Sequence, residues 1–387
     1  MIFSLLFACA DEADDTSAGS GDTAAEAYFC EAGPGLICRY AGTGNQALGA
    51  DDIPATESHL YLPLDITIGP DGAGYLLDWS NHRIRRVDPD TGIVTTIAGV
   101  AFIGDGPEGP AETAALNHPT HIQFGTDGNL YFAAWHNSRV DMIDMSTMTL
   151  SFLAGNGKRE FTGDDGPAME AALNLPSATA FGPDGTLYIS DQANFRIRAL
   201  DAAGMITTFA GTGEKGYGGD GGPAKDALFH AGSGQEATPG SRILVKDNLL
   251  YIADTQNNRI RVIDLDTTII ETIAGNGIAG AEGDGGPATE ASLFGPTDIA
   301  LGPNGELYIA DTENDCVRVV HADGNLTTFA GTCGAPGDAG DGGPTHESKL
   351  HHPYGVSTDP EGNVYISDTY NNVVRVAYAE DPPELME

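Results

Sequence analysis

The chain has 387 residues and a formal net charge of −38 at pH 7, with 56 acidic and 18 basic side chains. This balance excludes nucleic acid as a partner, because binding to phosphates needs clustered lysines and arginines. After the first residues, no segment is long and apolar enough to span a membrane.

The first residues resemble a bacterial export signal, although the apolar run is short and no Lys or Arg precedes it. The apolar run of residues 1–9 ends at Cys9, and its Leu-Phe-Ala-Cys resembles a lipoprotein processing box in which Cys9 carries the lipid. Residues 10–26 are acidic, small and non-aromatic, which predicts a disordered tether. We expect an exported protein, lipid-anchored at the outer membrane or cell surface; a plain secretory signal or a disordered end is the alternative.

Residues 27–380 repeat one pattern six times: a short strand ending in an acid, then an Asn, then arginines. Successive copies lie 56, 57, 63, 57 and 57 residues apart and begin at Tyr75, Tyr131, Tyr188, Tyr251, Tyr308 and Tyr365. Each unit has four apolar segments that alternate with period two, and a tight turn such as Asp-Gly joins the first two. Repeated four-stranded antiparallel units predict an all-β fold, a six-bladed β-propeller.

The ends of this region predict how the ring closes. The sixth unit, which starts near His352, lacks its fourth strand, and a matching strand stands near the N-terminus at residues 37–42. We expect this strand to complete the C-terminal blade and so remove the free sheet edges. Residues 381–387 form an acidic tail, and we expect the propeller to be a monomer.

A second phrase connects the blades. It reads Gly-Asp-Gly-Gly-Pro-Ala from Gly219 and has close copies at Gly163, Gly283 and Gly340. Its proline, preceded by Asp or Gly, predicts a helix of one to two turns. Repeats and connectors together resemble the bacterial version of the NHL-repeat family over about residues 30–380. This resemblance implies a binding scaffold, a sensor domain or, in some cases, an enzyme.

Four cysteines remain besides Cys9. Cys30 and Cys38 flank a Gly-Pro-Gly turn, while Cys316 begins a strand and Cys333 follows its hairpin partner. An oxidising compartment favours two local disulfides, Cys30–Cys38 and Cys316–Cys333. The alternative is four free thiols.

The polar residues that recur in the blades are expected to be structural. An Asp ends the second strand, an Asn follows three residues later, and an Arg lies in the third strand, as in Asp191, Asn194 and Arg198. Such residues cap turns and pair charges between strands.

Blade two departs from the pattern, because Ala134 replaces the Asp and is followed by Trp135 and His136. Blade one carries Trp79 at the position of Trp135, and the chain has no other tryptophan. Aromatic residues with polar tips in loops of one face predict binding of a protein, a peptide or a glycan. The expected binding residues are Trp79, His82, Trp135, His136 and Tyr370. The alternative is that each tryptophan ring packs on the neighbouring blade.

The residue at the mouth of the innermost strand is a histidine in blades two, four and six: His118, His230 and His352. Three imidazoles with an open fourth position hold a catalytic zinc, and the arrangement resembles the peptidyl-hydroxyglycine amidating lyases. His121, Asp65 and Asp298, three residues further on, would assist. Blade four aligned on Pro239 instead places Thr238 there, and two histidines alone are ordinary hydrogen-bonding residues.

The leading hypothesis is a tethered propeller that acts as a recognition scaffold. The alternative is a lyase or lactone hydrolase with zinc or calcium in the central channel, and a third hypothesis is a purely structural envelope protein.

Overall fold

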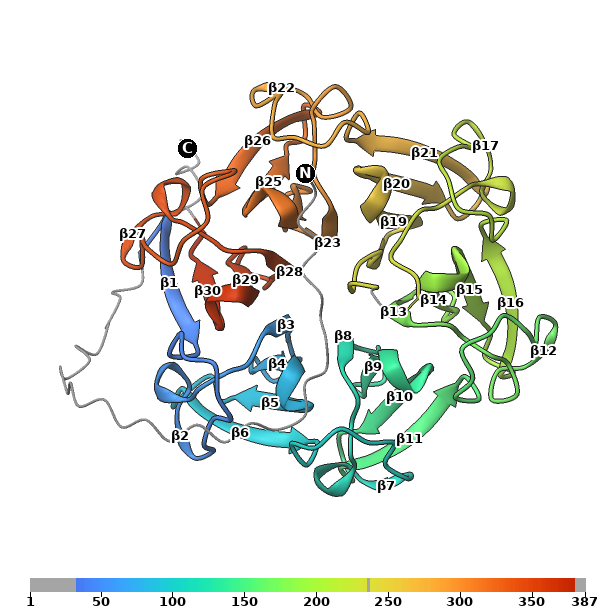
Figure 1. Cartoon of the computed structure of the whole chain (residues 1–387), viewed down its shortest axis with the longest axis horizontal. Coiled ribbons are helices and arrows are strands. Elements are labelled where there is room, and N and C mark those ends of the chain that lie inside the picture. The colour runs from blue at the N-terminus through green and yellow to red at the C-terminus, as the bar shows by residue number, and fades with distance from the viewer. Residues whose placement is uncertain (1–32, 235–236, 380–387) are drawn as a thin grey trace, which may run out of the picture.

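The computed structural model describes residues 33–234 and 237–379 and shows six antiparallel sheets in a ring around a central channel (Figure 1). The six-bladed propeller is therefore confirmed. The predicted signal segment, the tether 10–26 and the tail 381–387 lie outside the described residues. Within those residues, no helix has the length and apolar character needed to cross a membrane.

Each blade runs from the channel outward in chain order. Blade one consists of β3 (Pro63–Ile68), β4 (Gly74–Asp78), β5 (Arg83–Val87) and β6 (Ile93–Ala98). Blade two consists of β8 (Pro119–Phe124), β9 (Leu130–Ala134), β10 (Arg139–Asp144) and β11 (Thr149–Ala154). Blade three consists of β13 (Pro176–Phe181), β14 (Leu187–Asp191), β15 (Arg196–Leu200) and β16 (Met205–Ala210).

Blade four consists of β18 (Ile243–Lys246), β19 (Leu249–Asp254), β20 (Arg259–Asp264) and β21 (Ile269–Ala274). Blade five consists of β23 (Pro296–Leu301), β24 (Leu307–Asp311), β25 (Cys316–Val320) and β26 (Asn325–Ala330). Blade six consists of β28 (Pro353–Thr358), β29 (Val364–Asp368) and β30 (Val373–Ala377) from the C-terminal side and β1 (Leu36–Ala41) from the N-terminal side.

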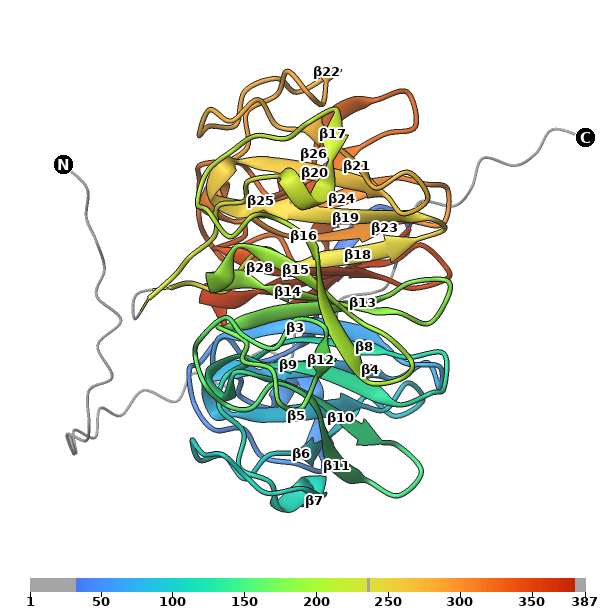
Figure 2. The same ribbon diagram turned by 90° about the vertical axis from the view of Figure 1, so that its right-hand side faces the viewer.

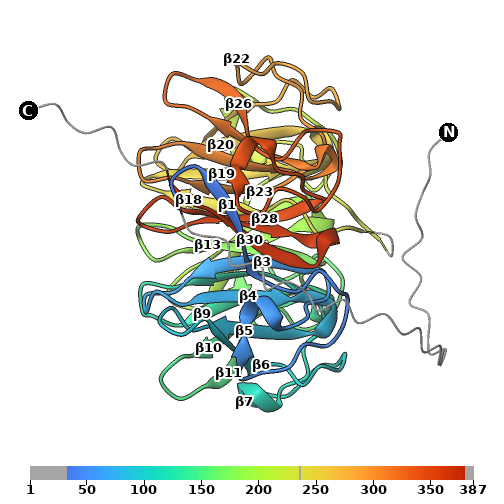
Figure 3. The same cartoon turned by 90° about the vertical axis from the view of Figure 1, so that its left-hand side faces the viewer.

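The ring closes as the sequence predicts. Strand β1 pairs antiparallel with β30, with Cys38 opposite Val376. Figure 3 shows the blue β1 lying beside the red β30 at the edge of the ring. This pairing joins the two ends of the repeat region within one sheet and leaves blade six with the same strand order as the others.

The connectors differ from the prediction. A helix was expected to begin at each proline, but Pro223 is extended (φ −61°, ψ 131°) and belongs to a two-residue strand, β17 (Gly222–Pro223). A single 3-10 turn, η6 (Ala224–Asp226), follows it. Each connector strand pairs with the outer strand of a blade and so becomes the fifth strand of that sheet. The other connector strands are β2 (Ile53–Pro54), β7 (Gly109–Pro110), β12 (Gly166–Pro167), β22 (Gly286–Pro287) and β27 (Gly343–Pro344).

The hydrophobic core lies between neighbouring blades. One buried cluster joins Leu77 and Ile84 of blade one to Phe132 and Ile143 of blade two. The repeated tyrosine of the second strand takes part in this packing, since the Tyr131 ring meets Phe181 of the next blade at 4.8 Å between centroids. The period-two pattern thus puts one face of each sheet against the preceding blade and the other against the following one.

The repeated polar residues form a buried network in five of the six blades, as the sequence predicts. In blade three, Asp191 accepts hydrogen bonds from the Asn174 backbone N–H (2.7 Å) and from the Asn194 side chain (2.8 Å). Arg198 is fully buried and pairs with Asp191 (3.3 Å) and with Asp164 of the connector (2.7 Å). The Asp of the connector phrase therefore has a role of its own, because it neutralises the buried arginine.

In blade two a different ion pair replaces this network, because both repeated charged positions carry other residues. Ala134 stands at the Asp position, and Asp141 stands at the position of the buried arginine. Asp141 pairs with Arg139 (3.2 Å), and Arg139 also pairs with Asp105 of the connector (2.6 Å). Burial raises the pKa of Asp141 to about 7, against the attraction of Arg139. The blade thus keeps an internal ion pair although both repeated charges have changed.

The glycine that follows each fourth strand is required by close backbone approach. Gly155 has φ +95°, and a Cβ atom there would lie 2.4 Å from the Ser138 carbonyl oxygen. The corresponding distance at Gly211, with φ +89°, is also 2.4 Å, to the Phe195 carbonyl oxygen. Only glycine combines this φ with this contact, which explains the Ala-Gly pair at the end of every fourth strand.

A disulfide joins Cys316, the first residue of β25, to Cys333 after β26, with 5.0 Å between their Cα atoms. This pair is confirmed. Cys30 lies outside the described residues, so the Cys30–Cys38 pair stays a prediction.

Candidate functional site

The residues that differ between blades gather on one face of the ring. Each second strand ends in a 3-10 turn, such as η2 (Trp79–Asn81), η4 (Trp135–Asn137), η8 (Thr312–Asn314) and η10 (Thr369–Asn371). Because Pro63 at the start of β3 pairs with Asp78 at the end of β4, these turns flank the mouths of the innermost strands. We call this side the turn face. In Figure 2 the yellow-green segment before β18 projects beyond the ring.

A ring of residues with positive φ surrounds the channel mouth on the turn face. In five blades this residue directly precedes the proline that opens the innermost strand, and in blade four it precedes Arg242, which takes the place of that proline. The φ angle lies between 48° and 58° at all six positions, which are Leu62, His118, Leu175, Ser241, Gly295 and His352. In blade four the position belongs to Ser241, so neither His230 nor Thr238 occupies it. The His230 backbone N–H donates to Asp254 (3.0 Å), as the His351 N–H donates to Asp368 (2.7 Å). His230 therefore corresponds to His351, one residue before the ring position.

This placement separates the three predicted zinc ligands. His118 and His352 belong to the ring, whereas His230 lies outside it. In the part of the chain that the structure describes, one set of three His, Cys, Asp or Glu side chains has all its ligand atoms within 4.8 Å of one another, and it consists of Asp315, His351 and His352. The structure does not bring His118 and His230 into such a set with His352.

At blades one and two, three histidines form an imidazole cluster. The Nδ1 atoms of His118 and His136 lie 3.1 Å apart, and the ring centroids of His82 and His118 lie 4.3 Å apart. Burial lowers the pKa of His118 to about 3, with a further contribution from the other two histidines. Burial likewise lowers the pKa of His82 and His136 to about 4. All three imidazoles are therefore neutral at pH 7.

The two tryptophans pack against this cluster. Trp135 is 2% exposed, stacks on His136 (4.4 Å between centroids) and packs with Leu175 and Ala193 of blade three. Trp79 is half-buried and lies 4.6 Å from the His118 ring. Neither indole N–H has a hydrogen-bond partner in the described structure. Trp135 thus matches the packing alternative, and of the two rings only Trp79 reaches solvent to an appreciable extent.

At blades five and six, histidines meet carboxylates and tyrosines. His352 Nδ1 lies 2.9 Å from Asp315 Oδ1, and His352 Nε2 lies 3.6 Å from Glu313 Oε2. The Tyr370 ring stacks on His352 at 4.5 Å between centroids and 5° between planes. Burial opposes the charged form of His352, but the hydrogen bonds and charges of Asp315 and Glu313 outweigh it and raise its pKa to about 9.

Arg242 plugs the middle of the channel. It stands where the other five blades have the proline that opens the innermost strand, and it is almost fully buried. Its guanidinium pairs with Asp65 of blade one (2.8 Å) and Asp298 of blade five (2.7 Å). It also donates to the carbonyl oxygens of Leu64 (2.9 Å) and Thr120 (2.7 Å). One side chain therefore ties blade four to blades one, two and five.

Asp65 and Asp298 also join neighbouring blades. Asp65 Oδ2 accepts the Ile122 N–H of blade two (2.9 Å), and Asp298 Oδ2 accepts the Val356 N–H of blade six (2.9 Å). Both aspartates were expected to assist a metal site, but their hydrogen bonds serve Arg242 and the channel wall. Sequence reasoning missed Arg242, although the absence of the proline in blade four was visible.

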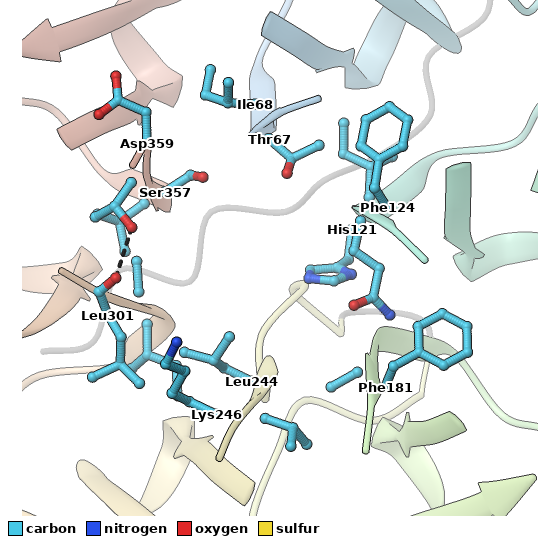
Figure 4. A pocket seen from close by; sticks show the side chains of 18 of the residues that line it. Thr67, Ile68, His121, Phe124, Phe181, Leu244, Lys246, Leu301, Ser357 and Asp359 are labelled. Atoms are coloured by element: carbon cyan, nitrogen blue, oxygen red, sulfur yellow. Dashed lines mark hydrogen bonds between the residues drawn. The ribbon is translucent and has the colours of Figure 1, made fainter. Parts of the chain in front are cut away.

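Beyond Arg242 the channel widens into a cavity of about 1260 Å³ that opens opposite the turn face. Figure 4 shows the His121 ring turned into this space, across from Leu244 and Lys246. Burial, with the nearby Arg242 charge, lowers the pKa of His121 to about 3, so its imidazole is neutral. His121 therefore belongs to the opposite side of the channel from His118.

Comparisons with known proteins agree with this architecture. Residues 155–201 match the teneurin NHL domain, and residues 295–320 match the NHL repeat. NHL repeat-containing protein 2 from Bos taurus is 27% identical over 64% of this chain and 37% of its own length. Teneurin-3 from Danio rerio is 26% identical over 93% of this chain and 14% of its own length. The chain thus spans much less than two thirds of these relatives.

Two solved structures show the same fold. An auxiliary nutrient binding protein from Bacteroides thetaiotaomicron superimposes with a TM-score of 0.64 and 18% identity over 88% of this chain and 75% of that one. A gluconolactonase from Xanthomonas campestris gives a TM-score of 0.52 and 12% identity over 82% and 86%. The chain is therefore a six-bladed β-propeller that matches the NHL repeat over part of its length and is similar to NHL repeat-containing proteins.

Proposed function

We propose that this protein is a recognition scaffold that binds a protein or peptide partner on the turn face. The observation that carries the proposal is a rim of exposed apolar side chains in the connector loops on this face. Leu48, Phe102, Ile103 and Ile278 are each more than half exposed. Phe102 and Ile103 are consecutive, and exposed apolar side chains that lie next to each other favour an interaction site.

The loops that carry this rim are fastened to the blades. The Asn137 side chain donates to the Gly104 carbonyl oxygen (3.1 Å), and the Asn314 side chain donates to the Gly280 carbonyl oxygen (2.7 Å). Loops held in this way lose little conformational freedom when a partner binds. The repeated Asn therefore supports recognition indirectly, through the rigidity of the loops.

A protein or peptide fits this surface better than a glycan. Sugars stack on the open faces of aromatic rings, but the Trp135 ring is covered by His136 and blade three. Three of the four rim residues named above are aliphatic, and aliphatic side chains fill hydrophobic contacts with peptides. The net charge of −38 favours a cationic partner by electrostatic complementarity.

The proposed location is outside the cytoplasm, at the cell envelope, with Cys9 as the lipid-bearing residue. Support comes from the export-like first residues and from the Cys316–Cys333 disulfide, because disulfides persist in oxidising compartments. The name of the Bacteroides structure, an auxiliary nutrient binding protein, fits a binding role at an envelope.

The alternative enzyme, a lyase or lactone hydrolase with a metal in the central channel, has less support. Arg242 fills the middle of the channel, and His230 stands outside the ring of residues at its mouth.

A selection from a displayed random peptide library on residues 27–387 tests the scaffold proposal. We expect cationic peptides with apolar anchors, and a loss of at least tenfold in affinity for a Phe102→Ser/Ile103→Ser variant. Met169→Ser is the matched control, since Met169 is exposed beside β12, whose Pro167 pairs with Met205 at the opposite end of the blade. A glycan array is screened in parallel. Binding to glycans alone, or peptides that bind both variants equally, would overturn the proposal.

A further inference from the structure

We propose that Asp315, His351 and His352 form a binding site for a divalent transition metal of the zinc class, at the junction of blades five and six on the turn face. The site differs from the predicted set His118, His230 and His352, with which it shares only His352. The metal site is independent of the proposed partner binding, because it is inferred from the spacing of these three side chains and not from the exposed apolar residues.

The three side chains already lie at nearly the spacing that one ion requires. Each offers one ligand atom, and all these atoms lie within 4.8 Å of one another. Zinc ligands lie about 2.0–2.2 Å from the ion, so two ligands of one ion are at most about 4.4 Å apart. Small side-chain rotations therefore suffice to close the site, without a change in the backbone.

The backbone explains how two consecutive histidines reach one ion. Consecutive residues in a strand point to opposite sides, but His352 has φ +48°, in the left-handed region. This turn brings the His351 and His352 ring centroids to 5.3 Å. All six blades share the conformation, yet of the six only blade six has histidines at both positions. Blade four has His230 followed by its insertion, and blade two has Asn117 before His118.

Asp315 reaches the site through a contact that other blades also make. It follows η8, and its Oδ1 accepts the His352 backbone N–H of the next blade (2.9 Å). Asn258 and Asn372 make the same contact to Gly295 (2.9 Å) and Leu62 (3.0 Å). Blade five replaces this amide by a carboxylate. A charged ligand therefore stands beside two imidazoles at a position where an amide would satisfy the fold.

Neighbouring residues orient the ligands. Glu313 Oε2 lies 3.6 Å from His352 Nε2, on the far side of the ring from Asp315. A carboxylate on the second nitrogen of a ligating histidine fixes the ring and raises its basicity. Tyr370 stacks on the same ring and limits its rotation. His352 would thus bind the ion through Nδ1, while the Glu313 carboxylate faces Nε2 at 3.6 Å.

The donor set selects the kind of metal. Two imidazoles and one carboxylate suit zinc, cobalt, nickel and iron, whereas calcium and magnesium prefer oxygen ligands alone. Three protein ligands also leave at least one coordination position open to solvent. Half-exposed Glu313 beside the site shows that it is accessible from the turn face.

The test is titration of the metal-free, full-length protein with Co²⁺ and Zn²⁺ at slightly alkaline pH. We expect one ion per chain, a visible Co²⁺ ligand-field band, and displacement of Co²⁺ by Zn²⁺. Three variants take the residue that another blade has at the same position: Asp315→Asn, His351→Asn and His352→Leu. Each should lower the affinity by at least about 100-fold, and Glu313→Gln by about 10-fold.

His230→Asn is the matched control and should leave the titration unchanged, because His230 has the position of His351 in a blade without a second histidine. The variants keep side chains that other blades tolerate, so circular dichroism should show an intact propeller. Absence of stoichiometric binding at millimolar Co²⁺ and Zn²⁺ would overturn the proposal. So would binding that survives in all three ligand variants, or binding of Ca²⁺ in preference to both metals.

Discussion

Replacement of Arg242 by methionine should destabilise the ring more than any surface charge change. Methionine keeps most of the side-chain volume but removes the positive charge between Asp65 and Asp298. Removal of one partner from a buried ion pair costs about 3–5 kcal/mol, because the remaining charge stays buried without compensation. The carbonyl oxygens of Leu64 and Thr120 also lose their donor. We therefore expect the free energy of unfolding to fall by about 3–5 kcal/mol.

Arg86→Met provides the matched control. Arg86 pairs with Asp71 at 2.9 Å, close to the Arg242 distances, but these side chains are 27% and 41% exposed. An exposed pair contributes about 0–1 kcal/mol, so the control should lose no more than this. Urea unfolding of both variants, followed by circular dichroism, measures the difference. Equal losses in the two variants would refute the view that burial makes the Arg242 pairing decisive.

The pH dependence of the Arg242 variant gives a second check. Burial raises the pKa of Asp65 to about 7 even with Arg242 present, and Asp298 adds to the shift. Loss of Arg242 raises it further, so the folded variant holds protons that the unfolded chain, with a pKa of about 4, releases. A raised carboxyl pKa lowers stability as the pH rises above about 4. The parent and the variant share this loss up to about pH 7, and above it Asp65 ionises in the parent while it stays protonated in the variant. The deficit of Arg242→Met should therefore be smaller at about pH 6 than at about pH 8.5, and Asp65→Asn/Asp298→Asn in that background should recover part of it.

Three further predictions concern packing, the disulfide and the imidazole cluster. Trp135→Ala should cost about 3–5 kcal/mol in urea unfolding, and half-buried Trp79→Ala clearly less; equal costs would contradict the packing role. Cys316→Ser/Cys333→Ser should cost about 3 kcal/mol for a sequence separation of 17, seen as a lower midpoint, and an unchanged midpoint would speak against the bond. The pKa values of His82, His118 and His136 are lowered in the folded protein, so these side chains take up protons more readily in the unfolded chain. Their contribution to folding stability is therefore present above about pH 6.5 and lost as the pH falls toward 4. His136→Phe should therefore lose less stability than the parent between pH 6.5 and 4.5, by thermal melts at each pH.

The sequence was sufficient for the architecture because the propeller is built from short-range information repeated six times. The tight hairpin turns, the period-two apolar segments and the Ala-Gly pair are local signals, and each blade forms from one stretch of chain. Only β1 comes from elsewhere, and the missing strand of the sixth unit revealed it. The connectors were mistaken for helices because a two-residue strand is stabilised by an edge that the local sequence does not contain.

The candidate site depended on contacts between blades, which no local pattern encodes. The insertion of blade four leaves the alignment of this blade ambiguous in the sequence. The positive φ of Ser241 and the contact of His230 with Asp254 show that Ser241, and not His230, stands at the channel mouth. The pairing of Asp315 with His352 joins residues 37 positions apart across a blade boundary. Arg242 reaches Asp65 from 177 positions away. Sequence alone determined the repeat, the blade number and the ring closure, whereas the tertiary structure decided which of the non-repeated side chains meet, because ring closure brings together residues that are distant along the chain.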